Sequence, residues 1–337
     1  MKRIAILGGG SWGTALAIVL ARANRPHEVV LWVRDAALAE SIRRDRENKL
    51  YLAGHQVPDT VQVIDDAGAA LGNAGVVIGA IPAAHARTVY QRVLPHIVRG
   101  TPMVSATKGL EPATRARMSE VISQVFQVVS PRFPPRIAVL SGPSFAAEAA
   151  AGQPTAVVLA SSDIGLANEL QEELAAPNFR LYTNEDVLGV ELAGAMKNVM
   201  AIAAGVCQGI GLGSNALAAL ITRGLAEMTR LAVALGARPE TLSGLAGLGD
   251  LVLTCTGSLS RNRHVGIELG KGRSLAEILD GMKMVAEGVG TAPALLALAR
   301  GAGIELPITA QVAAILDEGR SPREAIRSIM ERPLKRE

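Results

Sequence analysis

The chain has 337 residues, 49% hydrophobic and 19% charged, a composition that excludes a disordered chain and, at about 150 residues per domain, indicates two domains. There are 34 Lys and Arg against 31 Asp and Glu, a formal net charge of +3, and only 3% of residues are aromatic. So weak a charge and so few stacking side chains argue against a nucleic-acid partner. Two cysteines, Cys207 and Cys255, are too few for a disulfide framework. We expect small buried side chains there, and no metal site.

The N-terminus combines Met-Lys-Arg with an apolar stretch, which resembles a secretory signal. Gly8, Gly9, Gly10 and Gly13 interrupt that stretch, and a different mechanism accounts for them below. The sequence has no uninterrupted apolar run of about 18 residues, the length that spans a bilayer. We therefore expect a cytoplasmic protein without membrane insertion.

The first half of the chain alternates short strands with helices. The apolar run Val76–Ile81 is typical of a strand that is buried on both faces of a parallel sheet. The other predicted strands are Arg3–Leu7, Glu28–Val33, Pro102–Ser105, Ile137–Leu140, Thr155–Leu159 and Arg180–Thr183, with helices at Trp12–Asn24 and His85–Val98. This alternation predicts an α/β doubly wound domain over residues 1–186.

Strand patterns end after residue 186. The remaining segments have helical periodicity and are separated by Gly, Ser or Pro. The predicted helices are Val187–Gly205, Asn215–Leu235, Ser258–Leu269, Leu275–Met282, Thr291–Ala302, Thr309–Glu318 and Pro322–Glu331. We predict an all-helical domain over residues 187–337.

The turn from the first predicted strand into the first predicted helix is Gly-Gly-Gly-Ser-Trp-Gly, from Gly8 to Gly13, which fits G-x-G-x-x-G. In a Rossmann-like βαβ unit these glycines permit a tight turn, close approach to a pyrophosphate, and close packing of helix on strand. The N-terminus of the helix adds backbone N–H groups and a positive dipole end. The alternative is a glycine-rich turn that binds nothing, but the position between strand and helix favours a dinucleotide site.

Arg34 and Asp35 follow the second predicted strand. An acidic residue at this place holds the ribose hydroxyls of NAD, whereas an arginine accommodates the 2′-phosphate of NADP. Arg34 therefore favours NADP(H), with NAD(H) still open; the alternative is a solvated arginine at the start of a helix.

Two charges stand in otherwise uncharged segments. Lys197 is the one charged residue of 192–206, and Asp250 is the one charged residue of the glycine-rich segment 242–256. Burying either charge is costly unless it is paired, and desolvation brings a lysine toward the acid–base range. The structural alternatives are a lysine that reaches solvent along its own stem and an aspartate that caps a helix.

Polar residues gather at three further places. Ser260, Arg261 and Asn262 offer donors for a phosphate at a predicted helix start, although a solvated helix terminus has the same composition. Lys108 follows one predicted strand, and Gly142 and Ser144 follow another, which places them at the carboxyl edge of the sheet, where ligands of doubly wound folds bind.

Together these residues resemble the bacterial-type NAD(P)-dependent glycerol-3-phosphate dehydrogenase family, nearly from end to end. The blocks that carry the resemblance lie at Gly8–Ala17, Ala106–Glu111, Ser141–Glu148, Glu191–Gly205, Ala219–Met228, Gly244–Thr256, Ser260–Arg263 and Val285–Val289. Several blocks in family order and spacing are far more specific than the glycine turn alone.

The resemblance implies reversible reduction of dihydroxyacetone phosphate to sn-glycerol 3-phosphate, a phospholipid precursor, by an oxidoreductase in which Lys197 is the proton donor or acceptor. It implies these substrate contacts: Lys108, Gly142, Ser144, Lys197, Asp250, Ser260, Arg261 and Asn262. It implies these cofactor contacts: Gly8, Gly10, Ser11, Trp12, Gly13, Arg34, Lys108, Ala146, Arg261, Val285 and Glu287.

The residues themselves leave the role of Asp250 open, since it can orient the Lys197 ammonium or hold a substrate hydroxyl. Two other functions compete with this one. One is a different hydroxyacid dehydrogenase, such as a 6-phosphogluconate-like enzyme, and the other is a dinucleotide sensor without catalysis. For assembly we expect a homodimer by default.

Overall fold

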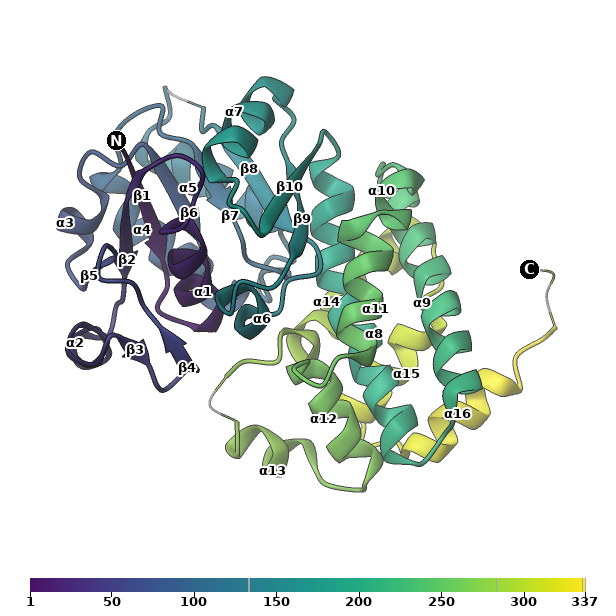
Figure 1. Ribbon diagram of the computed structural model, residues 1–337. Coiled ribbons are helices and arrows are strands. Elements are labelled where there is room, and N and C mark those ends of the chain that lie inside the picture. The colour runs from purple at the N-terminus through teal and green to yellow at the C-terminus, as the bar shows by residue number, and fades with distance from the viewer. Residues whose placement is uncertain (133, 283, 335, 337) are drawn as a thin grey trace. The chain divides into compact units, whose positions relative to one another are not determined.

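The computed structural model describes residues 1–132, 134–282, 284–334 and 336. The chain divides into two compact units, Met1–Glu191 and Leu192–Glu337. Helix α8 (Val187–Gly209) begins in the first unit and continues in the second (Figure 1).

The first unit is built on an eight-stranded sheet in the order β10-β9-β8-β7-β6-β1-β2-β5. Its strands are β1 (Lys2–Leu7), β2 (His27–Trp32), β5 (Gln62–Ile64), β6 (Val76–Gly79), β7 (Met103–Ser105), β8 (Ile137–Ser141), β9 (Thr155–Ala160) and β10 (Phe179–Asn184). Neighbouring strands are parallel except β8 and β9, which run antiparallel. The chain leaves β1 toward β2 on one side and later returns to β6 on the other, which makes the carboxyl end of β1 the topological switch point.

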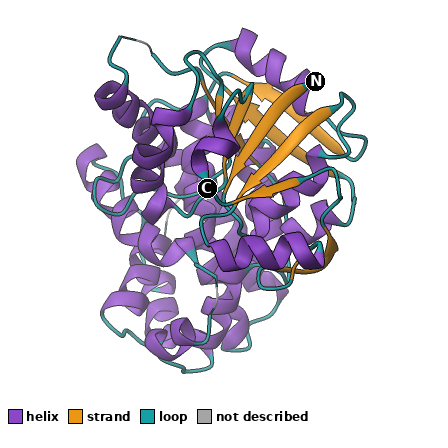
Figure 2. Cartoon of the chain, turned by 90° about the vertical axis from the view of Figure 1, so that its left-hand side faces the viewer, coloured by secondary structure: helices purple, strands orange, loops and turns teal. Residues whose placement is uncertain are grey.

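Helices cover both faces of this sheet (Figure 2). Successive side chains of a strand point to opposite faces, so Ile4 and Ile6 enter one core cluster while Ala5 and Leu7 enter the other. The first cluster lies under α1 (Ser11–Leu20), α2 (Ala36–Asp45), α6 (Ala146–Ala150) and α7 (Ile164–Leu174), and the second under α3 (Ala67–Leu71), α4 (Ala83–Val93) and α5 (Met118–Val129). A separate antiparallel hairpin joins β3 (Glu47–Asn48) to β4 (Leu52–Gln56).

The second unit is helical, with no strand among its described residues. After α8 come α9 (Ser214–Ala234), α10 (Pro239–Ser243), a π-helix (Leu245–Gly249), α11 (Asp250–Thr256), α12 (Arg261–Gly270), α13 (Leu275–Asp280), α14 (Glu287–Ala302), α15 (Pro307–Asp317) and α16 (Pro322–Met330). The predicted fold class, a Rossmann-like unit followed by an all-helical one, is confirmed. The antiparallel β9, the short β5 and the β3–β4 hairpin were not predicted.

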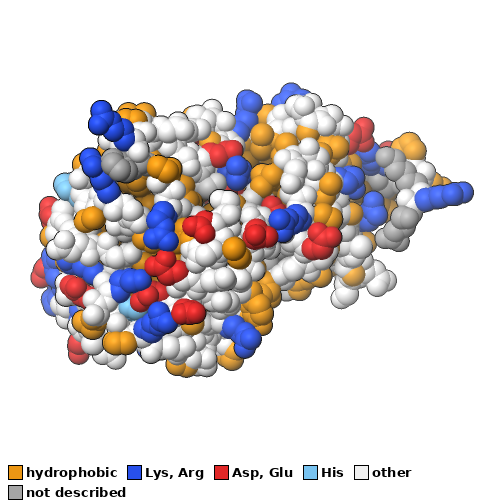
Figure 3. All heavy atoms as spheres, turned by 90° about the horizontal axis from the view of Figure 1, so that it is seen from above, with side chains coloured by type: hydrophobic (Ala, Val, Ile, Leu, Met, Phe, Trp, Pro, Cys, Tyr) orange, Lys and Arg blue, Asp and Glu red, His pale blue; other side chains and the backbone are white. Residues whose placement is uncertain are grey.

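Helix α8 has the length and apolar composition of a membrane-spanning helix. However, 83% of its most apolar 18-residue window is buried inside the protein, as in the core helix of a globular protein. On the face shown in Figure 3, positively and negatively charged side chains are interspersed, which agrees with the near balance of charges in the sequence.

Glycines let α8 and α12 approach each other backbone to backbone. A Cβ on Gly205 of α8 would lie 2.0 Å from the carbonyl oxygen of Arg263, and a Cβ on Gly266 of α12 would lie 2.0 Å from that of Ile202. No real Cβ tolerates such a distance, so the crossing requires glycine on both helices. It fixes the first turn of α12 relative to the segment of α8 that carries Lys197.

We expect Gly266→Ala to lower the free energy of unfolding by roughly 1–3 kcal/mol, because the added methyl collides with rigid backbone. Gly290→Ala is the matched control: it lies within α14, where a Cβ would meet nothing within 4 Å, and should raise the free energy of unfolding by up to about 1 kcal/mol. Urea denaturation followed by circular dichroism measures both. Equal effects of the two substitutions would contradict this account.

Candidate active site

The three glycines of the predicted dinucleotide turn differ in what surrounds them. Gly8 has φ 122°, and a Cβ there would lie 2.5 Å from the carbonyl oxygen of Ala80; a Cβ on Gly13 would lie 1.9 Å from that of Gly8. A Cβ on Gly10 would meet nothing within 4 Å. The outer two glycines are therefore required by packing, and the middle one faces open space, as a site for close approach of a pyrophosphate requires.

Donor groups gather at the start of α1, directly after this turn. The N-cap residue is Gly10, which has no side chain to accept from the first-turn N–H groups. The indole Nε1 of Trp12 is buried and has no hydrogen-bond partner in the described structure. Backbone donors, a helix dipole and an unpaired indole N–H suit an anionic dinucleotide, and Gly8 to Gly13 would hold its pyrophosphate.

Arg34 and Asp35 are both exposed beyond the end of β2. The Asp35 carboxylate accepts a hydrogen bond from the backbone N–H of Leu38 at 2.8 Å and thereby caps α2. The Asp35 carboxylate, which lies near the expected ribose position, is therefore already used as the N-cap of α2.

Lys108 lies beyond β7, and Gly142 and Ser144 lie beyond its parallel neighbour β8, so the two loops share one edge of the sheet. The Lys108 Nζ donates to the Gly142 carbonyl oxygen at 2.7 Å and to the Ser144 Oγ at 3.2 Å. Gly142 has φ 129°, a left-handed conformation that favours glycine. Ala146 begins α6 two residues after Ser144. The structure thus brings three of the predicted residues into direct contact.

The loop after Lys108 is fixed by Glu111, which sequence reasoning did not single out. Arg87 of α4 donates to both carboxylate oxygens of Glu111, at 2.8 and 2.7 Å, and Thr114 also donates to that carboxylate. Glu111 is 6% exposed. The hydrogen bond from Arg87 lowers the pKa of Glu111 below its ordinary value despite the opposing effect of burial.

In the second unit, Lys197 and Asp250 form a buried ion pair. They are 7% and 1% exposed, and the Lys197 Nζ lies 3.0 Å from the Asp250 Oδ1. The same Nζ donates to the Thr254 Oγ1 at 2.7 Å, and that hydroxyl donates to the Asp250 carbonyl oxygen at 2.6 Å. Thr254 was missed in the sequence, although it lies one helical turn after Asp250 and therefore on the same face.

The backbone before Asp250 is unusual. Residues Leu245–Gly249 form a π-helix that runs directly into α11, and a Cβ on Gly247 would lie 2.0 Å from the carbonyl oxygen of Leu242. Asp250 is thus the first residue of α11, preceded by Gly249 as its N-cap, and its side chain turns to Lys197. The alternative in which Asp250 caps the helix is not observed. Short π-helical segments are frequent at functional sites.

The predicted phosphate-binding residues occupy the first turn of α12. The Ser260 hydroxyl accepts from the Arg263 N–H and caps the helix, and Arg261 is its first residue. Asn262 is 8% exposed; it donates to the Asn198 Oδ1 at 3.0 Å and accepts from the Gly288 N–H at 2.9 Å.

These bonds connect α12 to the residue after Lys197 and to the start of α14, where Glu287 lies. Burial lowers the pKa of the Arg261 guanidinium, and the charge of Glu287 opposes that shift. Val285, two residues before Glu287, is 46% exposed.

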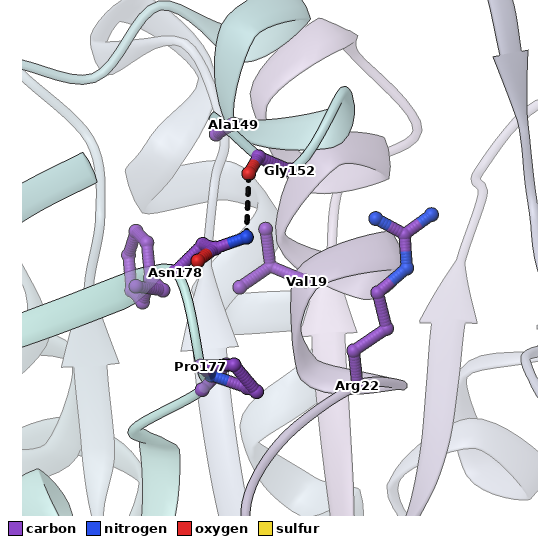
Figure 4. A pocket seen from close by; sticks show the side chains of 8 residues that line it. Val19, Arg22, Ala149, Gly152, Pro177 and Asn178 are labelled. Carbon is purple, nitrogen blue, oxygen red and sulfur yellow. Dashed lines mark hydrogen bonds between the residues drawn. The ribbon is translucent and has the colours of Figure 1, made fainter. Parts of the chain in front are cut away.

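A separate pocket of about 70 Å³ lies in the first unit (Figure 4). Val19 from the last turn of α1 and Arg22 from the segment after α1 line it, and Asn178 donates to the Gly152 carbonyl oxygen beside it at 2.7 Å. None of the predicted site residues lines this pocket. Among the described residues no cluster of three His, Cys, Asp or Glu side chains is placed to hold a metal ion.

Comparison with known proteins decides the family. The N-terminal and C-terminal profiles of NAD-dependent glycerol-3-phosphate dehydrogenase match residues 3–167 and 186–327. The chain is 55% identical to glycerol-3-phosphate dehydrogenase [NAD(P)+] of Koribacter versatilis over 334 residues, covering 99% of this chain and 98% of that protein. The chain belongs to the NAD-dependent glycerol-3-phosphate dehydrogenase family.

Two further relatives support the family assignment over the full length. The enzyme of the same name from Acidobacterium capsulatum is 54% identical over 337 residues, covering 99% of both chains. The crystal structure of glycerol-3-phosphate dehydrogenase from Coxiella burnetii superposes with a TM-score of 0.92 at 41% identity, covering 98% of this chain and 99% of that one. The family resemblance stated from the sequence motifs is confirmed, and the chain is an oxidoreductase of this NAD(P)-linked family.

The Arg87–Glu111 ion pair, which fixes the loop after Lys108, should make the free energy of unfolding depend on pH. Because folding lowers the pKa of Glu111, its charged form stabilises the native state above its ordinary pKa of 4.5, and this contribution is lost as the pH falls from there through the lower folded-state pKa. We expect Glu111→Gln to lower the free energy of unfolding by roughly 1–3 kcal/mol at pH 7 and by progressively less below pH 4.5. Urea titrations from pH 3 to pH 7 measure the difference. A difference that does not change with pH would refute it.

Proposed function

We propose that this chain catalyses the reversible NAD(P)H-dependent reduction of dihydroxyacetone phosphate to sn-glycerol 3-phosphate, with Lys197 as the proton donor. The observation that carries the proposal is the buried Lys197–Asp250–Thr254 arrangement. The Lys197 amine is shielded from solvent and is hydrogen-bonded to two oxygen atoms. Family membership gives the substrate class, and the glycine turn gives a place for the dinucleotide.

The proposed chemistry needs a hydride and a proton. When bound, the reduced nicotinamide supplies the hydride that the ketone carbon receives, and the carbonyl oxygen then carries a developing negative charge. The Lys197 ammonium stabilises that charge and gives its proton to the oxygen, which leaves a neutral amine to be protonated again from solvent. In the reverse direction the neutral amine takes the hydroxyl proton.

We propose that Asp250 orients Lys197 and keeps it charged, rather than holding a substrate hydroxyl. The Asp250 carboxylate lies 3.0 Å from the ammonium, and an anion at that distance favours the charged form of a lysine. Thr254 fixes the same nitrogen from the next turn of α11. With two acceptors from one helix, the ammonium has a defined position, as proton transfer to a bound substrate requires.

The phosphate of the substrate is assigned to Arg261 and Asn262 at the start of α12. A guanidinium, an amide and a helix N-terminus together suit a phosphate dianion. The Asn262 amide donates once to Asn198 and retains a second N–H. Substrate contacts of Lys108, Gly142, Ser144 and Ser260, and cofactor contacts of Ser11, Trp12, Ala146, Val285 and Glu287, follow from the family motifs.

For the cofactor we propose NADP(H) in preference to NAD(H). Asp35 is engaged as the cap of α2, which leaves the exposed Arg34 to meet the adenosine end of the dinucleotide. We further propose action in the cytoplasm, where the free Cys207 and Cys255 remain reduced, and assembly as a homodimer. The product would supply phospholipid synthesis.

The function is tested by following NADPH absorbance after addition of dihydroxyacetone phosphate. We expect the wild type to oxidise NADPH, and Lys197→Ala to lower kcat by roughly 100-fold or more while NADPH affinity, measured by quenching of protein fluorescence, changes little. The control is Lys271→Ala. Lys271 is an exposed lysine of the second unit that pairs with Glu268, and its substitution should retain wild-type turnover. A wild type that binds NADPH but neither oxidises it with dihydroxyacetone phosphate nor reduces NADP+ with 6-phosphogluconate would be a sensor. Loss of NADPH binding alone in Lys197→Ala would count against its role.

Arg34→Ala tests the cofactor preference. We expect it to lower kcat/KM for NADPH by roughly 10- to 100-fold, the effect of removing one charge-assisted contact to a phosphate, with kcat/KM for NADH little changed. The control is Arg44→Ala. The Arg44 side chain is 69% exposed near the other end of α2, and its substitution should change kcat/KM for neither dinucleotide. Equal losses with both dinucleotides would show that Arg34 does not read the 2′-phosphate.

A further inference from the structure

The glycine turn is held from behind by a residue of the β3–β4 hairpin. Asn48 is 0% exposed, and its Nδ2 donates to the carbonyl oxygen of Gly9 at 2.9 Å and to the Oγ1 of Thr14 at 2.8 Å. Its Oδ1 accepts from the backbone N–H of Tyr51 at 3.2 Å. Both amide hydrogens and the amide oxygen are therefore engaged, and the side chain has one orientation.

The hairpin that supplies Asn48 is itself rigidly attached. Arg46, just before β3, has a left-handed backbone with φ 50°, and its guanidinium donates to the carbonyl oxygens of Val57 at 3.3 Å and Val61 at 3.1 Å. Leu52 of β4 is 5% exposed and belongs to the core cluster that also contains α1 residues. Asn48 is thus presented to the glycine turn from a fixed support.

The Gly9 carbonyl shares a peptide plane with the N–H of Gly10. In a trans peptide these two groups point in opposite directions, so fixing one fixes the other. Asn48 draws the Gly9 oxygen into the protein interior, which turns the Gly10 N–H the other way. A Cβ on Gly10 would meet nothing within 4 Å, so the backbone of this residue is open to the close approach of a ligand.

We propose that Asn48 is a positioning residue for dinucleotide binding, which aims the Gly10 N–H at the cofactor pyrophosphate by holding the Gly9 carbonyl. It touches the turn and not the cofactor. The inference rests on the proposed function only in that this turn binds a dinucleotide. It adds a residue that lies 34 positions from Thr14 in the sequence and outside the glycine motif.

The test is direct binding of NADPH, without substrate, to three variants. Asn48→Asp keeps the shape but replaces the donor by an acceptor that repels the Gly9 oxygen; Asn48→Ala removes the donor. We expect the Kd for NADPH to rise about tenfold for Asn48→Ala, the factor for one ordinary hydrogen bond, and further for Asn48→Asp. Thr14→Val is the matched control, because it loses its bond to Asn48 but leaves the bond to Gly9, and its Kd should stay within about threefold of the wild type. Thermal denaturation of all three gives their stabilities.

A Kd that rises in both Asn48 variants and not in Thr14→Val, at similar losses of stability, supports the proposal. An unchanged Kd in the Asn48 variants overturns it, as does an equal rise in Thr14→Val, which would indicate a purely structural role. Asn48→Asp alone decides the matter where the alanine variant does not fold. If the wild type binds NADPH but does not reduce dihydroxyacetone phosphate, the proposed reaction fails while this test still stands; if it binds neither dinucleotide, both fail.

Discussion

Contact between backbones with no side chain between them positions both parts of the candidate site. In the first unit a Cβ on Gly13 would lie 1.9 Å from the Gly8 carbonyl oxygen, so α1 can start directly against the end of β1 only with glycine there. In the second unit Gly205 and Gly266 allow α8 and α12 to touch, which sets the first turn of α12 beside the α8 segment with Lys197 and Asn198. Packed backbone deforms little, so these contacts define the site geometry before any polar group is added. The polar contacts then select among the few arrangements that remain.

Buried carboxylates supply the next level of organisation, and they do so in two ways. Glu191 accepts from the Ser119 N–H at 2.8 Å at the start of α5, and Glu227 accepts from the Ile308 and Thr309 N–H groups at 2.8 and 2.9 Å at the start of α15. Burial raises the pKa of both, and the hydrogen bonds oppose that shift. Each of these acids thus caps a helix that is remote in sequence, a favourable place for a negative charge. Glu191 also pairs with Arg117 at 2.8 Å, whereas Asp250, buried as deeply, contacts the Lys197 ammonium and the hydroxyl of Thr254 in its own helix.

The features predicted from the sequence were those marked by a local residue pattern or by the free-energy cost of burying an unpaired charge. Periodicity indicated the α/β unit and the helical unit, and the glycine spacing indicated the turn. The isolation of Lys197 and Asp250 among uncharged residues indicated that each charge needs a partner, and the structure pairs them with each other. Asn48, Glu111 and Asn198 were missed because their partners are distant in the chain, and a single asparagine or glutamate carries no signal of burial on its own. The antiparallel direction of β9 was not predicted, because a buried strand has the same apolar run whether its neighbour is parallel or antiparallel. Thr254 had a signal, the one-turn spacing from Asp250, that was overlooked.

The buried ion pair and the π-helix are best understood together. Burying an ammonium and a carboxylate costs desolvation energy that their attraction does not reliably offset, so such a pair is a weak source of stability. The π-helix at Leu245–Gly249 likewise departs from the α-helical geometry that the backbone prefers. Glycine does not account for all of this departure, because four of the seven residues from Gly244 to Asp250 are not glycine. Both departures meet at Asp250, the residue that the π-helix delivers into α11 and toward Lys197. A folded chain keeps two unfavourable features at one residue when the resulting geometry is needed, and the proposed proton transfer from Lys197 to a ketone oxygen would require such a fixed, buried amine.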